Sequence, residues 1–141
     1  MAYEVQETLS GTHGQLWIND VLFEEVTKFS AELNPEFADV NKGGSMAKYK
    51  KLIGYEGKGE VTMNKVTSKL MRAVADNLMK GKQTMVKIVS NLDDPDSRGN
   101  ERIVIYDAIL EKWTLADWES KSVGEEKIPF TFTRYEILED I

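Results

Sequence analysis

The stretch NPEFADVNKGGSMAKYKKLIGYEGKG, residues Asn34 to Gly59, is the one around which the rest of the chain is organised. It lies between two segments with strand-like patterning. It is too long for a hairpin turn and too poor in apolar residues for a core. Connections in compact domains usually span about 4–6 residues, and much longer ones are usually functional or disordered. The sequence therefore predicts a long inter-strand loop over residues 34–59 that binds something outside its own domain.

This stretch is also the most basic part of an acidic chain. Between Asn41 and Lys58 it holds five lysines and one acid, Glu56, whereas the whole chain carries a net charge of −6. A cationic loop on a negative body is attracted to acidic surfaces. Another copy of the same chain is a natural partner for it.

Length and composition predict one domain over residues 1–141, of ordinary globular type. The chain has no cysteine, which excludes disulfides, thiolate catalysis and cysteine metal sites. Residues 1–13 form a polar arm without the pattern of a signal peptide, and we expect it to be flexible or to depend on a partner. No stretch approaches the roughly 20 apolar residues of a membrane anchor. The negative charge argues against stable binding of nucleic acid.

On the N-terminal side of the stretch, Asn19-Asp20 separates two short apolar runs, Gln15–Ile18 and Val21–Val26. Asn and Asp tolerate positive φ, so these runs predict a hairpin with a two-residue turn. Alternating apolar and polar residues predict that the second strand continues to Leu33. We expect Pro35 to end it.

On the C-terminal side, residues 59–64 alternate as a strand. From Thr67 the period changes to three and four, which predicts an amphipathic helix over about 67–80 that ends at Gly81. Further strands are predicted over three segments, 84–89, 103–115 and 128–138. The fold class is therefore mainly β, an antiparallel β-sandwich or barrel with one helix.

Residues that could carry chemistry lack the partners they need. His13 is the only histidine, which gives little basis for a zinc site. Ser45 and Lys48 match the S-x-x-K pattern of serine acylases, but they follow two glycines in a predicted loop and lack the companion motifs. Gly54, Gly57 and Gly59 precede a strand rather than a helix, which excludes a phosphate cradle.

The acidic turn around Asp93, Asp94 and Asp96 suggests calcium at first sight. Counted from Asp94, however, Ile105 occupies the twelfth position of the EF-hand loop, where a glutamate is needed. A turn between strands is the better interpretation. We therefore expect no catalytic residue, no metal and no cofactor.

The whole pattern resembles the tail tube proteins of contractile-tailed phages and of phage-tail-like bacteriocin particles of Gram-positive bacteria. The matching features are the polar arm ending at Ser10-Gly11, the hairpin at Asn19-Asp20, the basic loop, the strand Gly57–Met63, the helix with Gly81-Lys82, the turn Asp93-Asp94-Pro95, and the closing segments Phe130-Thr131-Phe132 and Tyr135–Leu138.

The resemblance implies a structural virion component rather than an enzyme. Six copies would close into a ring, and rings would stack into the hollow inner tube of a contractile injection system. Sheath, tape-measure and baseplate proteins would be its partners. The particle would be assembled in the bacterial cytoplasm and then act outside the cell. Alternatives are a tube-initiating baseplate protein, or a small β-barrel module that binds a ligand or protein.

Three sets of residues are predicted to serve such a tube. Contacts between rings are assigned to the long loop, at Lys42, Lys48, Tyr49, Lys50, Lys51 and Tyr55. Their acidic counterparts are Asp93, Asp94 and Asp96, or Glu136, Glu139 and Asp140. An acidic lumen wall that repels DNA is assigned to the polar stripes of two strands, at Glu24, Lys28, Ser30, Glu32, Glu60, Thr62 and Asn64. The side of the helix that faces outward or toward a neighbour is assigned to Lys69, Arg72 and Asp76.

Overall fold

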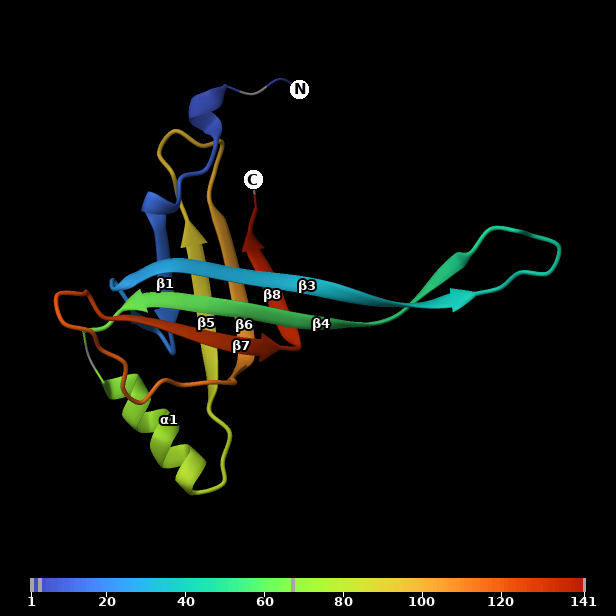
Figure 1. Ribbon diagram of the computed structural model, residues 1–141. Coiled ribbons are helices and arrows are strands. Elements are labelled where there is room, and N and C mark those ends of the chain that lie inside the picture. The colour runs from blue at the N-terminus through green and yellow to red at the C-terminus, as the bar shows by residue number, and fades with distance from the viewer. Residues whose placement is uncertain (1, 3, 67, 141) are drawn as a thin grey trace.

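The computed structural model describes residues 2, 4–66 and 68–140, without the side chains of residues 69, 71 and 73. As predicted, the described part of the chain is mainly β, with eight strands, one α-helix and two short 3-10 turns (Figure 1). The strands are β1 Gly14–Ile18, β2 Val21–Leu22, β3 Val26–Val40, β4 Tyr49–Asn64, β5 Met85–Leu92, β6 Glu101–Leu110, β7 Glu125–Phe132 and β8 Arg134–Glu139. The helix α1 spans Lys69–Met79, and the turns η1 and η2 span Val5–Glu7 and Gly11–His13.

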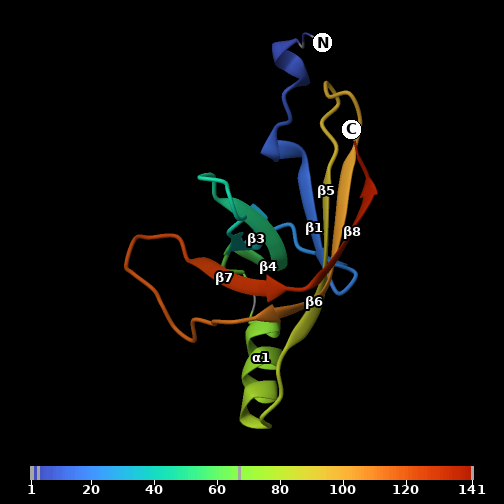
Figure 2. The ribbon, with the colours of Figure 1, turned by 90° about the vertical axis from the view of Figure 1, so that its right-hand side faces the viewer.

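The strands form one antiparallel sheet, in the order β2-β1-β5-β6-β7-β4-β3, with β8 beside β6. The sheet is folded into two layers and is not a closed barrel. β1, β5, β6 and β8 form one layer, and β3, β4 and β7 run across it as the second (Figure 2). β6 belongs to both layers, because it pairs with β8 over residues 102–106 and with β7 at Ile109 and Leu110. Asp107, with φ of 53°, lies between the two pairings.

The core fills the space between the layers. It is built from Leu16, Ile18, Val61, Met63, Val86, Ile88, Ile105, Ala108, Ile128, Phe130 and Phe132. Phe130 stacks on Phe29, with ring centroids 5.9 Å apart. A Cβ at Gly59 would lie 2.3 Å from the Phe130 ring and 2.5 Å from the carbonyl oxygen of Ser30. Only glycine therefore allows β4 to lie this close to the aromatic core.

The Asn19-Asp20 hairpin is confirmed. Both residues have positive φ, 51° and 67°, and Ile18 pairs directly with Val21 across the turn. The prediction of one continuous strand from Val21 to Leu33 is wrong. Residues 23–25 interrupt it, because β2 pairs with β1 in one layer whereas β3 pairs with β4 in the other.

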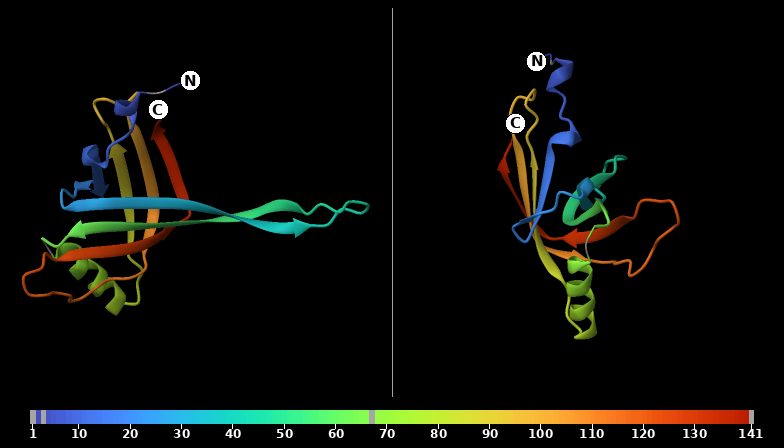
Figure 3. Two further views of the ribbon diagram at one scale, coloured as in Figure 1. Left: turned by 45° about the horizontal axis from the view of Figure 1, so that its top comes forward. Right: turned by 90° about the vertical axis from the view of Figure 1, so that its left-hand side faces the viewer.

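The prediction of a loop over residues 34–59 is wrong in its extent. β3 continues to Val40 and β4 begins at Tyr49, so the loop itself is residues 41–48 (Figure 3). Pro35 does not end β3 but lies opposite Tyr55 within it. β3 is at the end of the sheet order, and an edge strand tolerates proline because its free side needs no N–H donor.

Two later strand predictions differ in their ends. The run predicted over 103–115 stops at Leu110, and the run predicted over 128–138 divides at Thr133 into β7 and β8. The predicted helix is confirmed as α1, although Thr67, the predicted start, lies outside the described residues. Leu70 packs against the core, whereas Leu78 and Met79 at the other end of α1 are 73% and 88% exposed.

Candidate functional site

The far half of the β3–β4 hairpin projects from the rest of the molecule (Figures 1 and 3). We call this half, residues 33–56, the arm, and the remainder the body. Within the described chain, β7 pairs with β4 only from Gly57 to Asn64. The arm is therefore a ribbon of two strands, and such ribbons are marginally stable in water unless another surface packs against them.

The arm carries large apolar side chains that the subunit leaves exposed. They are Leu33, Phe37, Val40, Met46, Tyr49, Leu52, Ile53 and Tyr55. Phe37 lies opposite Leu52, and these two are 52% and 56% exposed. Strand alternation places Leu33, Pro35 and Phe37 on the same side of β3 as the core residue Phe29. The apolar side of the body therefore continues along the arm without a layer to cover it.

The residues predicted to contact another ring all lie on the arm and are exposed. Lys42 and Lys48 belong to the loop, and the other four lie on β4. The Nζ of Lys42 is 5.8 Å from the centre of the Tyr49 ring. Ser45 Oγ is 3.2 Å from Tyr49 Oη, so the serine of the S-x-x-K pattern contacts a tyrosine. At the root of the arm, the Tyr55 hydroxyl donates a hydrogen bond to the Thr133 carbonyl oxygen.

The side of β3, β4 and β7 that faces away from the core is polar, and we call it the polar face. The register aligns its rows: Lys28, Thr62 and Lys127; Ser30, Glu60 and Pro129; Glu32, Lys58 and Thr131. Asn64 lies at one end of this face, opposite Glu125. The predicted lumen stripe is thus brought together, with two differences. Glu24 lies apart, in the connection between β2 and β3, and Thr62 is only 6% exposed.

The charges on the polar face differ from the acidic wall predicted from the sequence. Lys28, Lys58 and Lys127 stand among Glu32, Glu56 and Glu60. Lys58 Nζ lies 3.5 Å from a carboxylate oxygen of Glu56. The chain is acidic overall, but its acidic residues are not concentrated on this face. Net charge alone does not predict where on the surface the acidic residues lie. The face is polar and carries charges of both signs.

On α1, Arg72 and Asp76 are exposed one turn apart, whereas the side chain of Lys69 lies outside the described set. The acidic residues predicted to contact the lysines of the arm lie in different environments. Asp93 and Asp96 are exposed, while Asp94 is buried. On β8, Glu136 accepts a hydrogen bond of 2.9 Å from the Tyr106 hydroxyl, and Glu139 accepts one of 2.6 Å from the Asn100 amide.

Asp94 anchors the N-terminal segment, which the sequence predicted to be flexible or dependent on a partner. Its carboxylate accepts the backbone N–H of Asp96 at 2.9 Å and that of Ser10 at 3.0 Å. The N–H of Asp96, and then that of Ser10, hold the pKa of Asp94 below its ordinary value. Arg98 adds an ion pair with Glu7. An aspartate whose side chain accepts the N–H of the residue two positions later forms a known type of turn. The spacing of Asp94 and Asp96 is therefore the sequence signal for this role of Asp94.

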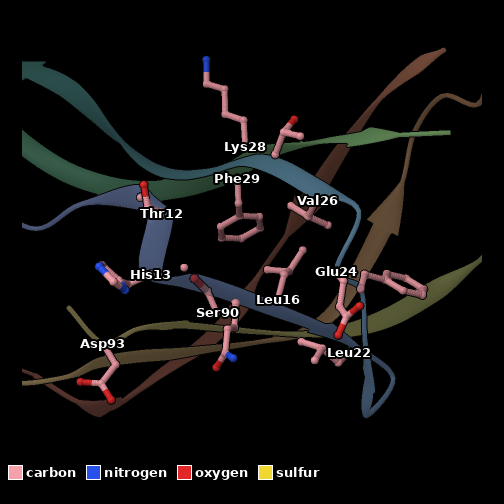
Figure 4. Close-up of a pocket in the computed structure, with 15 residues that line it drawn as sticks. Thr12, His13, Leu16, Leu22, Glu24, Val26, Lys28, Phe29, Ser90 and Asp93 are labelled. Carbon is pink, nitrogen blue, oxygen red and sulfur yellow. The ribbon is translucent and has the colours of Figure 1, made fainter. Parts of the chain in front are cut away.

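Between β1 and the first residues of β3 lies a hollow of about 500 Å³, which we call the mouth (Figure 4). Its apolar lining comes from Leu16, Leu22, Phe23, Val26 and Phe29, and its polar lining includes Thr12, His13, Glu24, Lys28 and Asp93. Figure 4 shows Leu16 on β1 and Phe29 on β3 pointing toward each other, with Asp93 and Glu24 at opposite ends. The sequence does not predict the mouth, because the position of this hollow depends on which strands lie at the edges of the two layers.

Among the described residues, no three histidine, aspartate or glutamate side chains come together as a metal site. No helix in the described part of the chain has the length and apolar character needed to cross a membrane.

Comparison with known proteins agrees with the fold. A family model described as "Phage tail tube protein" matches residues 1–139. The phage-like element PBSX protein XkdM of Bacillus subtilis (strain 168) is 32% identical over 143 residues, covering 100% of this chain and 97% of XkdM. The family match confirms the resemblance predicted from the sequence.

Two solved structures from an extracellular contractile injection system, PVC, share the fold. A chain of its sheath/tube terminator has a TM-score of 0.77 at 9% identity, with 96% of this chain and 100% of that chain covered. A chain of its sheath-tube complex has a TM-score of 0.74 at 9% identity, with 94% and 93% covered. The matched family and these neighbours are structural components of tails and injection systems, not enzymes.

Proposed function

Since the chain belongs to the phage tail tube protein family, we propose that it is the repeating subunit of a hollow tube, in which six copies close into a ring and rings stack. The observation that carries this proposal is the arm. It holds a row of large apolar side chains outside the body, where the subunit provides no layer to cover them. Exposed apolar patches of this kind mark protein interaction sites.

The shape of the subunit supports assembly into a ring. The arm projects from one side of the body, and an arm that packs against the body of the next copy makes a head-to-tail contact. Such head-to-tail contacts give closed rings when the rotation between copies closes. Among the described strands β3 is an edge strand, and no other strand of that part of the chain pairs with its free side. Pairing between copies would remove an edge that is otherwise prone to aggregation.

The polar face supports a water-filled lumen. Its rows of Lys28, Ser30, Glu32, Glu60 and Asn64 lie on the side of β3 and β4 that faces away from the core. A sheet with one side on the core and one side wet suits the inner wall of a tube. Because the face carries lysines and glutamates together, it offers no uniformly positive surface on which DNA could be held.

The outside of the tube would contact a sheath, with α1 as the candidate element through Arg72 and Asp76. Tape-measure and baseplate proteins would be further partners. The subunit would be assembled in the bacterial cytoplasm and then form part of an extracellular virion tail or bacteriocin particle. A similar fold in a sheath-tube complex supports this assignment.

The test is negative-stain electron microscopy of concentrated protein, seeded with sonicated tube ends. We expect rings with a central hole and tubes. The matched variant replaces residues 41–48 with Asn-Gly, a two-residue turn that keeps Val40 paired with Tyr49 but removes Lys42 and Lys48. We expect this variant to keep its thermal transition and to lose stacking.

The two proteins test different parts of the proposal. A wild-type protein that stays strictly monomeric under seeding would contradict the tube function and favour a binding module. A turn variant that forms long tubes would contradict only the role of the basic loop between rings.

A further inference from the structure

We propose that the mouth of one copy is the seat for the arm of the next copy, with the Phe37–Leu52 pair inserted against Phe29 and Leu22. This inference rests on the proposed tube function, and it adds which surface receives the arm. The partner is a second copy of this chain, bound head to tail.

The mouth is the open side of the sandwich. β2 and β1 end one layer and β3 ends the other, and in the part of the chain that the structure describes neither edge is extended by another strand. The hollow between them is about 500 Å³, within the roughly 300–1,000 Å³ of pockets that enclose ligands. Phe29 and Val26 are half-buried there, so the core is sealed incompletely at this point. Figure 4 shows Leu16 of β1 and Phe29 of β3 directed toward the same space.

The arm carries an exposed apolar pair of the kind that fills such a hollow. Phe37 and Leu52 are direct partners across the ribbon, and both are more than half exposed. They lie on the side of the ribbon that is continuous with the body's own core side. Inserted into a mouth, this pair would complete a neighbour's core as Val61 and Phe130 complete the subunit's own.

The charges around the two surfaces are complementary. On the arm, Lys50 lies opposite Asp39, two residues from the Phe37–Leu52 pair on each strand. In the mouth, Glu24 and Asp93 stand at opposite ends, whereas the Lys28 side chain extends away from the hollow on the other side of β3 (Figure 4). Lys50 of a seated arm can therefore meet a carboxylate at an end of the mouth. Because these groups are exposed, salt would weaken the contact without abolishing it.

A subunit cannot place its arm in its own mouth. Both lie on β3, the mouth at its first residues and the arm at its last. Phe29 and Phe37 are separated by eight residues of extended strand, a rise of about 26 Å at ~3.3 Å per residue. A rigid strand holds them apart, so an arm that fills a mouth belongs to another copy. Figure 1 shows the arm leaving the body on the side away from β1.

The experiment uses site-directed cross-linking, which is clean because the natural chain has no cysteine. The test variant carries Ile53→Cys on the arm, beside the inserted pair, and Thr12→Cys at the mouth. The control carries the same arm cysteine with Ile137→Cys on β8, another exposed position at a different edge of the sheet. Each single-cysteine variant is treated in parallel. All samples are assembled, checked by electron microscopy and treated with a short bismaleimide.

We expect a ladder of cross-linked oligomers for the Ile53–Thr12 pair, at least tenfold stronger than for the Ile53–Ile137 pair or the single variants. Tubes that cross-link through Ile137, or not through Thr12, would overturn the mouth as the seat while leaving the tube function intact. Absence of rings and tubes from every sample, wild type included, would overturn both.

A second measurement does not depend on cross-linking. Thr12→Trp places a bulky ring at the exposed rim of the mouth without changing the core. We expect it to fold normally and to lose assembly, whereas Ile137→Trp assembles. Normal tubes from Thr12→Trp would contradict the proposal.

Discussion

The two halves of the β3–β4 hairpin have the same strands and the same alternation, but opposite environments. In the body, Phe29 and Val61 pack under Phe130. In the arm, Phe37 and Leu52 are exposed to solvent. The difference is that β7 pairs with β4, and the layer of β1, β5, β6 and β8 packs against its core side, only in the body half. The apolar side of a strand is therefore covered where the subunit supplies a packing layer. We infer that another copy covers the apolar side of the arm.

The largest expected effect is on the body half. Gly59→Ala would put a methyl group 2.5 Å from the backbone carbonyl of Ser30, which cannot move without breaking the strand pairing. We expect a loss of about 3 kcal/mol or more in the free energy of unfolding, at or above the upper end for overpacking. Urea denaturation measures it. Gly54→Ala on the arm, where the nearest atom is a flexible Glu36 oxygen at 3.6 Å, should change stability by less than about 1 kcal/mol.

The arm should show the reverse behaviour. Phe37→Ser together with Leu52→Ser should leave the stability of the monomer within about 0.5 kcal/mol per substitution, because both side chains are largely exposed. Assembly should fail, since the apolar contact is lost. Sedimentation and electron microscopy measure this, with Val123→Ser, another exposed apolar position, as the control. Normal tube yield from the double variant would show that the apolar row of the arm has no role between copies.

A smaller difference is expected between two ion pairs. Lys65 Nζ lies 3.3 Å from Glu126, whose side chain is 8% exposed, whereas the Lys58–Glu56 pair is about half exposed on both sides. Lys65→Met leaves a buried carboxylate without its partner and should cost about 1–3 kcal/mol. Lys58→Met should cost at most about 1 kcal/mol. Equal losses in thermal unfolding would mean that the Glu126 carboxylate reaches solvent.

The smallest effect concerns the N-terminal segment. The pKa of Asp94 is lowered in the folded state, so its contribution is complete above the ordinary aspartate pKa of about 4 and disappears as pH falls toward the lowered value. We expect faster amide exchange at Ser10–His13 below that pH, with the strands unaffected. Asp94→Asn should show fast exchange at neutral pH, whereas Asp93→Asn should behave as wild type. Slow exchange at Ser10 in Asp94→Asn would assign the anchoring to Arg98 and Glu7 instead.

The sequence predicts local features well. Positive φ at Asn19-Asp20, the amphipathic period of α1 and the alternation in β4 each depend on neighbouring residues, and all three are confirmed. Prediction from the sequence fails where the local structure depends on a strand that is distant in the sequence. Nothing local shows that Pro35 lies on the free edge of a sheet, so local patterns predict a loop where the structure has the arm. The burial of Asp94 and the mouth both depend on segments more than 60 residues apart in sequence.

The central claim is that the arm is built to be covered by another copy. Hydrogen exchange compares the same amides in isolated subunits and in assembled tubes. We expect rapid exchange in the arm, residues 33–56, when the subunit is alone, and strong protection in tubes. The β5–β6 pairs in the body should be equally protected in both states. Tubes in which the arm exchanges as rapidly as in the monomer would show that no other copy covers the arm.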